Sequence, residues 1–230
     1  MAIANKLTKW LTNYDNPKSI GSRLRSKRIA PLLRLIESVF EEYGCVNIID
    51  VGGTETYWGI VGNKYLTDHN VTIKIVNLPI SKLPRDHGPF TFVHADACNL
   101  VGFDNDSFHI AHSNSVIEHV GDWDRMVKFS NEFKRVARKY FVQTPNYWFP
   151  IEPHFMTPFF HWLPKPICVW LVMKFSLGNW RKATSVDEAV RMVESSRLLS
   201  KKMFHELFSD ADVRTERLLL FPKSFIAIRK

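Results

Sequence analysis

Small and polar residues follow directly after five segments of the sequence that have the apolar, β-branched composition of strands. Asp50 lies near the end of the first segment and is followed by Gly52 and Gly53, while Asn77 ends the second. The remaining candidate positions are Leu78, Asp96, Ala97, Ser113, Asn114 and Ser115, with Thr144 to Asn146 after the fifth segment. Glycine lets a ligand approach the backbone because it has no β-carbon, and carboxylate, amide and hydroxyl groups hydrogen-bond polar ligands. These positions together predict one binding site for a small molecule.

The glycine segment favours a ligand with a positive charge over one with a phosphate. A dinucleotide site needs a third glycine and a helix N-terminus aimed at the pyrophosphate, whereas Glu55 occupies that place and would repel a phosphate. Asp50 can face an amino group. An unpaired carboxylate inside an apolar strand is costly, which favours a functional role for Asp50. The alternative is that Gly52 and Gly53 simply form the turn from a strand to a helix.

Two histidines are candidates for proton transfer. His119 follows the fourth segment and His154 the fifth, with Glu118 and Glu152 beside them. Imidazole is a suitable general base near neutral pH because its ordinary pKa is close to the working pH. A surface position at the start of a helix is the alternative for His119. We expect His112 to lie within its strand.

The spacing of apolar residues predicts the elements that position these side chains. Strands are expected at 46–51, 71–78, 91–96, 108–113 and 139–146, and helices at 28–43, 122–137 and 185–200; two further strands are expected in 213–221 and 223–230. Strands that alternate with helices indicate an α/β fold with a mainly parallel, doubly wound sheet. In such a sheet, ligands bind beyond the carboxyl ends of the strands, where the strand order reverses.

We expect a single domain over residues 1–230. It divides into N-terminal helices at 1–44, a core at 45–147, an insertion at 148–182, and a last helix and strands at 183–230. The insertion is rich in Phe, Trp and Pro. It could be a lid over the site, a surface that rests on a membrane beside a lipid-linked substrate with the help of nearby Lys and Arg, or a helical subdomain with its own small core.

Composition limits the class of protein. The chain has 230 residues, of which 45% are hydrophobic and 23% charged, and a formal net charge of +8 that could favour nucleic acid, anionic lipid or a phosphorylated substrate. Three scattered cysteines give neither a disulfide framework nor a zinc site, which fits a reducing compartment. The longest apolar run, 166–173, is far shorter than the roughly 20 residues that cross a bilayer. We therefore expect a cytoplasmic protein, with peripheral contact to a membrane as an open alternative.

The segments "IIDVGGTE", "IVNLP", "HADACNL", "FDNDSFHIAHSNSVIEHVGDW" and "FVQTPNYWFPIEPHF" occur in this order between about Cys45 and Phe155. They resemble class I S-adenosylmethionine-dependent methyltransferases of the methyltransferase type 11 group. The resemblance implies a Rossmann-like sheet with an antiparallel last strand, S-adenosylmethionine as cofactor and S-adenosylhomocysteine as product. Asp50 would face the cofactor's amino group, Asn77 the ribose hydroxyls and Asp96 the adenine.

Two positions depart from the family pattern. Glu55 stands where a third small residue is usual, and Asn77 stands where an acidic residue is usual, so weaker cofactor binding is expected. The acceptor is expected to be a small molecule, a glycan or a lipid-linked compound, methylated at oxygen. No Asn-Pro-Pro-Tyr motif follows the fourth strand, which argues against methylation of nucleic-acid bases. The alternatives are a non-catalytic methyltransferase-like binding protein and, further away, a NAD-type oxidoreductase.

Overall fold

The computed structural model describes residues 20–151, 155–218 and 220–230, with side chains from residue 28 onward. Within these residues, seven strands form one sheet in the order β3-β2-β1-β4-β5-β7-β6. The strands are β1 (Val46–Val51), β2 (Val71–Asn77), β3 (Phe90–His94), β4 (Phe108–Asn114), β5 (Ala137–Pro145), β6 (Asp212–Leu218) and β7 (Phe221–Arg229). Strands β1 to β5 are parallel, and the last strand, β7, pairs antiparallel with both β5 and β6. The predicted mainly parallel sheet with an antiparallel last strand is confirmed.

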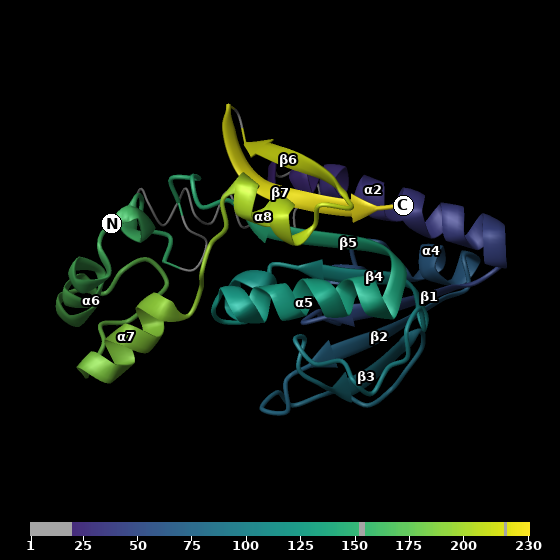
Figure 1. The fold of residues 1–230 in the computed structure, drawn as a ribbon, viewed down its shortest axis with the longest axis horizontal. Coiled ribbons are helices and arrows are strands. Elements are labelled where there is room, and N and C mark those ends of the chain that lie inside the picture. Colours follow the sequence, from purple (N-terminus) through teal and green to yellow (C-terminus); the bar gives the residue numbers. More distant parts are fainter. Residues whose placement is uncertain (1–19, 152–154, 219) are drawn as a thin grey trace.

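Helices cover both faces of this sheet (Figure 1). The described α-helices are α2 (Ile20–Tyr43), α3 (Glu55–Trp58), α4 (Asn63–Asp68), α5 (Trp123–Val136), α6 (Lys165–Lys174), α7 (Val186–Glu194) and α8 (Lys201–Leu207), and two 3-10 turns are η1 (Ile117–His119) and η2 (Phe160–Trp162). On one face, Leu32 of α2, Trp58 of α3 and Leu66 of α4 pack against alternate residues of β1 and β2. Because successive side chains of a strand point to opposite faces, the other residues of β1 face the second layer.

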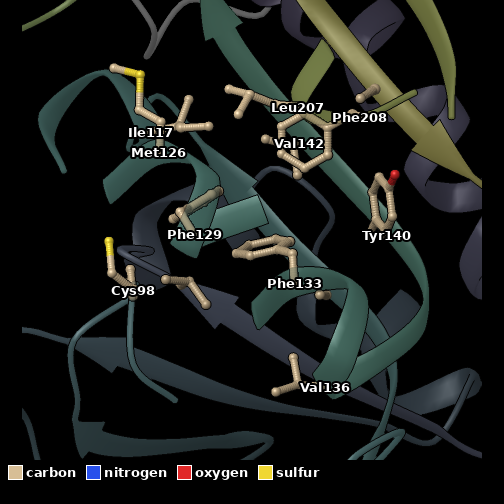
Figure 2. Close-up of a cluster of buried hydrophobic side chains, with 14 of the residues drawn as sticks. Cys98, Ile117, Met126, Phe129, Phe133, Val136, Tyr140, Val142, Leu207 and Phe208 are labelled. Atoms are coloured by element: carbon tan, nitrogen blue, oxygen red, sulfur yellow. The ribbon is translucent and has the colours of Figure 1, made fainter. Parts of the chain in front are cut away.

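The second layer consists of α5 and α8. Figure 2 shows Phe129 and Phe133 of α5 packed beside Val142 of β5, with Leu207 and Phe208 at the end of α8 closing the cluster. These side chains are almost completely buried. Two apolar layers on a central sheet therefore fix the strands whose carboxyl ends form the site.

Several element boundaries differ from the sequence expectation. The N-terminal helix ends at Tyr43 as predicted, and Gly44 directly after it has a φ of +69° and donates its N–H to the Phe40 carbonyl at 2.8 Å. The helix expected at 185–200 is split, because α7 ends at Glu194 and Ser200 caps the start of α8. Between them, buried Leu199 pairs with Asn146 at the end of β5, and this tertiary contact breaks the helical pattern. The short helix α4 was not predicted.

The segment after β5 forms a small helical subdomain with its own core. Phe155 and Phe160 pack with Cys168 and Val172 of α6 and with Ala189 of α7. This subdomain lies at the end of the sheet where the parallel strands finish (Figure 1). Because α7 packs on α6, the packing unit extends past residue 182, where the sequence suggested a boundary.

The three cysteines form no disulfide bond with one another. Cys45, Cys98 and Cys168 are all free, and the last two are buried. Among the described residues, no helix has both the length and the apolar character required to cross a bilayer.

Candidate functional site

Two pockets meet at the carboxyl ends of the parallel strands. The first has a volume of about 260 Å³ and the second about 290 Å³. The first is lined by Arg28, Ile29, Asp50, Gly52, Gly53, Thr54, Thr56, Tyr57, Ile60, His112 and Asn114. The second is lined by Val51, Gly52, Val76, Asn77, Leu78, Ser81, Ala95, Asp96, Ala97, Val116, His119, Val120 and Arg125. They share Gly52, which lies where the strand order reverses between β1 and β4. We refer to them as the Arg28 pocket and the Asn77 pocket.

The two glycines after β1 are required by the chain's own packing. Gly52 has a φ of +71°, and a β-carbon there would come within 2.5 Å of Val116 Cγ2. A β-carbon on Gly53 would lie 1.7 Å from Asp50 Oδ2. These glycines can therefore both form the turn and contribute to a ligand site. Gly52 is required by the packing of the turn, and it also lines both pockets.

Asp50 lies in the wall of the Arg28 pocket, and its carboxylate is bound within the protein. Oδ2 accepts a hydrogen bond from Trp58 Nε1 at 2.6 Å, and Oδ1 accepts one from His112 Nδ1 at 2.6 Å. Both Asp50 and His112 are buried. His112 lies within β4, as expected, and among the described residues its Nε2 has no hydrogen-bond partner. Asp50 thus places a carboxyl group in the pocket wall, with Trp58 and His112 as its hydrogen-bond partners.

Glu55, the residue that departs from the family pattern, does not line either pocket. Its Oε2 lies 2.9 Å from His87 Nε2 on the outer side of the turn. The pKa of His87 is raised above its usual value, mainly because its ring hydrogen-bonds to the Arg85 carbonyl. The Glu55 carboxylate raises this pKa further. Burial lowers it, but by less than these two effects together raise it. The pairing with His87 directs the charge of Glu55 away from the shared glycine.

The Asn77 pocket contains the predicted residues from the ends of β2 and β3. Asn77 Nδ2 donates to the Gly53 carbonyl at 3.1 Å, which turns the amide nitrogen toward the loop and leaves the amide oxygen as an acceptor for a ligand. Leu78 is half-exposed and Ala97 is largely buried, and both line this pocket.

Asp96 also lines the Asn77 pocket, paired with a residue that sequence reasoning missed. Its two oxygens lie 3.0 and 2.9 Å from Arg125 Nη2, and Oδ1 also accepts from the backbone N–H of Cys98 at 2.9 Å. Burial by itself would raise the pKa of Asp96, but the Cys98 N–H and the Arg125 guanidinium together hold the pKa below its usual value. Asp96 is therefore a carboxylate at neutral pH, with part of its accepting capacity used by Arg125.

The three candidates at the exit of β4 have different environments. Ser113 is buried and donates to the Val51 carbonyl at 3.1 Å, and Ser115, with a φ of +58°, donates to Gln143 Oε1 at 2.9 Å. Asn114 alone of the three lines a pocket, and its Oδ1 accepts from Arg28 Nη1 at 3.4 Å. Ser113 and Ser115 hold neighbouring strands together, so their contribution to a ligand site is to fix the position of Asn114.

His119 lines the Asn77 pocket and connects it to the helical subdomain. Its Nδ1 donates to the Ser195 carbonyl at 2.7 Å, which fixes the tautomer of the neutral ring. Its neighbour Glu118 is buried and accepts from Thr144 Oγ1 at 3.0 Å. The second candidate base, His154, and its neighbour Glu152 lie outside the described residues.

The basic segment "SRLRSKR" ends at Arg28, and charged side chains on a helix are most often solvated. Arg28 lines the first pocket. Its side chain is instead only 13% exposed and binds Glu216 through two contacts, Nη2 to Oε2 at 2.7 Å and Nε to Oε1 at 3.2 Å. The neighbouring apolar residue Ile29 was the signal in the sequence that could have indicated a buried Arg28, because a cation beside core residues needs a partner.

Comparison with known families supports the recognition made from the sequence. Residues 65–140 match the model of a methyltransferase domain family. This match runs from α4 into β5 and contains Asn77, Asp96 and the exit of β4, whereas the glycine turn lies before it. A search of curated proteins gives no match.

Solved structures share the fold. A S-adenosylmethionine-dependent methyltransferase from Methanosarcina mazei aligns with a TM-score of 0.51 at 15% identity, over 80% of this chain and 91% of that one. A second from Archaeoglobus fulgidus aligns with a TM-score of 0.50 at 10% identity, over 85% and 92%. An O-methyltransferase family protein from Burkholderia thailandensis aligns with a TM-score of 0.49 at 14% identity; the alignment covers 91% of this chain, which spans 57% of that protein. The Rossmann-like fold is thus confirmed.

Proposed function

We propose that this chain, which has the class I methyltransferase fold and belongs to a methyltransferase domain family over residues 65–140, binds S-adenosylmethionine across Gly52 and transfers its methyl group. The acceptor that we propose is a hydroxyl group of a small molecule, glycan or lipid-linked compound. The observation that carries the proposal is the pair of pockets that share Gly52 and offer different chemistry on its two sides.

The Asn77 pocket suits the adenosine part of the cofactor. The Asn77 amide oxygen can accept from ribose hydroxyls, and the Asp96 carboxylate can accept from the adenine amino group. The apolar side chains of Leu78, Val116 and Val120 can contact the flat base. Arg125 already uses part of the hydrogen-bonding capacity of the Asp96 carboxylate. We therefore expect Asp96 to offer the ligand one acceptor and not two.

The Arg28 pocket suits the amino-acid part of the cofactor. An amino acid carries a carboxylate and an ammonium group, and this pocket presents a guanidinium from Arg28 and negative charge from Asp50. Asn114 can hydrogen-bond either group. Neither pocket contains the third glycine that a pyrophosphate requires, which counts against the NAD-type alternative.

When bound, the cofactor supplies a methyl group that its sulfonium has already activated for displacement. The chain's own task is to hold the acceptor in line, exclude water and remove the acceptor's proton. We assign proton removal to His119, because it lines the Asn77 pocket at the exit of β4 and imidazole is a suitable general base near neutral pH. His154 is a further candidate from the sequence.

Calorimetric titration with S-adenosylhomocysteine tests cofactor binding. We expect the purified chain to bind this ligand, and Asn77→Ala to weaken binding about tenfold, because a ribose hydroxyl loses its acceptor. Arg28→Met should weaken it similarly. Arg34→Met, an exposed arginine on the same helix α2, is the matched control and should bind normally.

The result also separates the alternatives. Binding of NADH in place of S-adenosylhomocysteine would favour an oxidoreductase and overturn the proposal. Binding of S-adenosylhomocysteine without turnover of S-adenosylmethionine, for any hydroxylated metabolite, glycan or lipid acceptor offered, would favour the non-catalytic binding protein. Where turnover is found, His119→Gln should remove the acidic limb of its pH profile, because the loss of activity at low pH reports protonation of the imidazole base.

A further inference from the structure

The helical subdomain exposes a group of large apolar side chains, which we call the aromatic face. Its members are Trp148, Phe159, Trp162, Leu163, Ile167, Trp170 and Phe175, each at least 38% exposed. Soluble monomers rarely expose a contiguous apolar surface of this kind unless it binds something. The aromatic face is therefore a candidate docking surface.

Helix α6 presents its apolar side chains on two opposite sides. Cys168 and Val172, four residues apart, point into the subdomain core, whereas Ile167 and Trp170 lie on the other side and are exposed. Lys174, one turn beyond Trp170, continues the exposed side as a cation. Helical spacing thus separates a core side from an outward apolar side that ends in a positive charge.

Ring contacts join the aromatic face at both ends. Trp162 lies 5.1 Å from Phe159 and 6.2 Å from Trp148 between ring centroids. At the other end of α6, the centroids of Trp170 and Phe175 are 6.3 Å apart. Exposed Leu163 and Ile167 lie between these two groups in the sequence, so the aromatic face includes a strip of exposed side chains along residues 159–175.

The residues around this strip favour a lipid surface as its occupant. Tryptophan is enriched where a polar headgroup region meets hydrocarbon, because its ring is apolar and its N–H is not. Lys174 and Lys182 are exposed beside the strip, and the chain as a whole carries a net charge of +8. Basic residues next to an interfacial apolar face are attracted by anionic lipids.

We propose that the aromatic face docks the α6–α7 subdomain on the surface of a bilayer that contains anionic lipid. Helix α6 has ten residues, so it would lie in the interface and not span the membrane. Docking would place a lipid or lipid-linked acceptor within reach from the membrane surface, and this consequence rests on the proposed methyltransferase function. The proposal that the subdomain docks on lipid does not depend on that function.

Hydrogen bonds connect the subdomain to the candidate site. The Ser195 carbonyl accepts from His119, and the backbone N–H of Arg197 donates to the Glu118 carbonyl at 2.7 Å. Both contacts link the chain after α7 to η1, at the exit of β4. The subdomain that docks lies at the same end of the sheet as the two pockets, where the parallel strands finish (Figure 1).

Vesicle flotation of the full chain tests the proposal. We expect binding to phosphatidylcholine vesicles with about 30% phosphatidylglycerol and weaker binding to phosphatidylcholine alone. Trp170→Glu should lower the fraction bound to the anionic vesicles about tenfold, because a carboxylate would enter the headgroup region. Val101→Glu, at an even more exposed apolar position on another part of the molecule, should bind as the unmodified chain does.

A second pair of variants tests the charge. Lys174→Glu should reduce the preference for anionic vesicles, whereas Lys64→Glu on α4 should leave it unchanged. Absence of vesicle binding, or binding that Trp170→Glu does not reduce, would overturn the proposal. A dimer that Trp170→Glu dissociates would also overturn it, by assigning the aromatic face to a second copy of the chain.

Failure of docking and failure of the proposed function are distinguishable. Calorimetric titration of Trp170→Glu with S-adenosylhomocysteine should give the affinity of the unmodified chain, because Trp170 lies in neither pocket. A chain that binds the ligand but not vesicles refutes the docking alone. A chain that binds vesicles but not the ligand refutes the methyltransferase assignment and leaves the docking intact.

Discussion

At the scale of single residues, the site depends on the hydrogen-bond partners of two carboxyl groups. Asp50 lies in an otherwise apolar strand, where an unpaired charge is costly, and the structure places Trp58 and His112 on its two oxygens. Glu55 would oppose an anion near the glycine turn, and it pairs with His87. In both cases a partner from another part of the chain decides how much charge the pocket presents.

Replacement of Asp50 by asparagine should destabilise the fold by about 2–3 kcal/mol, because an amide can accept from only one of the two donors. Chemical denaturation of Asp50→Asn, His112→Phe and the double variant measures this. We expect a coupling free energy of about 1 kcal/mol or more between the two positions, since they share a buried hydrogen bond. Additive effects would show that the Asp50–His112 contact contributes nothing.

Replacement of Glu55 by glutamine should lower the pKa of His87 toward its usual value of 6.5. The folded-state pKa of His87 is raised, so the stabilisation from this pair is complete below the ordinary pKa and is lost as pH rises through the folded pKa. An NMR titration of the His87 ring in Glu55→Gln and in the control Asp68→Asn checks the direction. An unchanged pKa in Glu55→Gln would contradict the pairing.

At the scale of elements, the turn from β1 to α3 determines where the two pockets meet. Its geometry needs a left-handed residue at Gly52, and Val116, just after β4, fills the space that a side chain there would use. The turn is thus fitted to β4, the strand on the other side of the order reversal. A local motif and a neighbouring strand together create the shared wall of the site.

A comparison of two glycines separates backbone strain from this packing. Gly44 and Gly52 both have positive φ values, +69° and +71°, but a β-carbon on Gly44 meets nothing within 4 Å. Gly44→Ala should therefore cost about 1–2 kcal/mol from the backbone alone, and Gly52→Ala about 1–3 kcal/mol more from overpacking. Thermal or chemical denaturation gives both values.

The variant Val116→Ala supplies the control for this comparison. Combined with Gly52→Ala, it should recover part of the extra loss, because it removes the Cγ2 atom that the new β-carbon meets. Equal losses in Gly44→Ala and Gly52→Ala would show that Val116 moves freely and that the turn is not tightly fitted to β4.

At the scale of the whole molecule, one sheet carries two surfaces with separate tasks. The pockets lie at the carboxyl ends of β1 to β4, and the aromatic face lies on the subdomain that follows β5. The contacts of His119 and Glu118 with the chain after α7 are the physical connection between them. A ligand titration and a vesicle assay on the same variants therefore test two independent properties of one fold.

The order of elements and the candidate positions follow from the sequence because they depend on local information. Alternation of apolar and β-branched residues predicts strands, and residues that directly follow parallel strands must share one edge of the sheet. For this reason Asn77, Leu78, Asp96, Ala97 and Gly52 were expected at one edge, and all five line the Asn77 pocket. The split between α7 and α8 was missed because the contact of Leu199 with Asn146 is not local.

Only the tertiary structure decides which charged and polar groups pair with one another. Asp50 and His112 are 62 residues apart, Arg28 and Glu216 are 188 apart, and each pair is set by strand register and helix packing that no local pattern records. Sequence periodicity therefore determined the fold and the edge where chemistry can occur. Packing determined which charges are left for a ligand, because a buried charge takes its partner from whatever the fold brings within hydrogen-bonding distance.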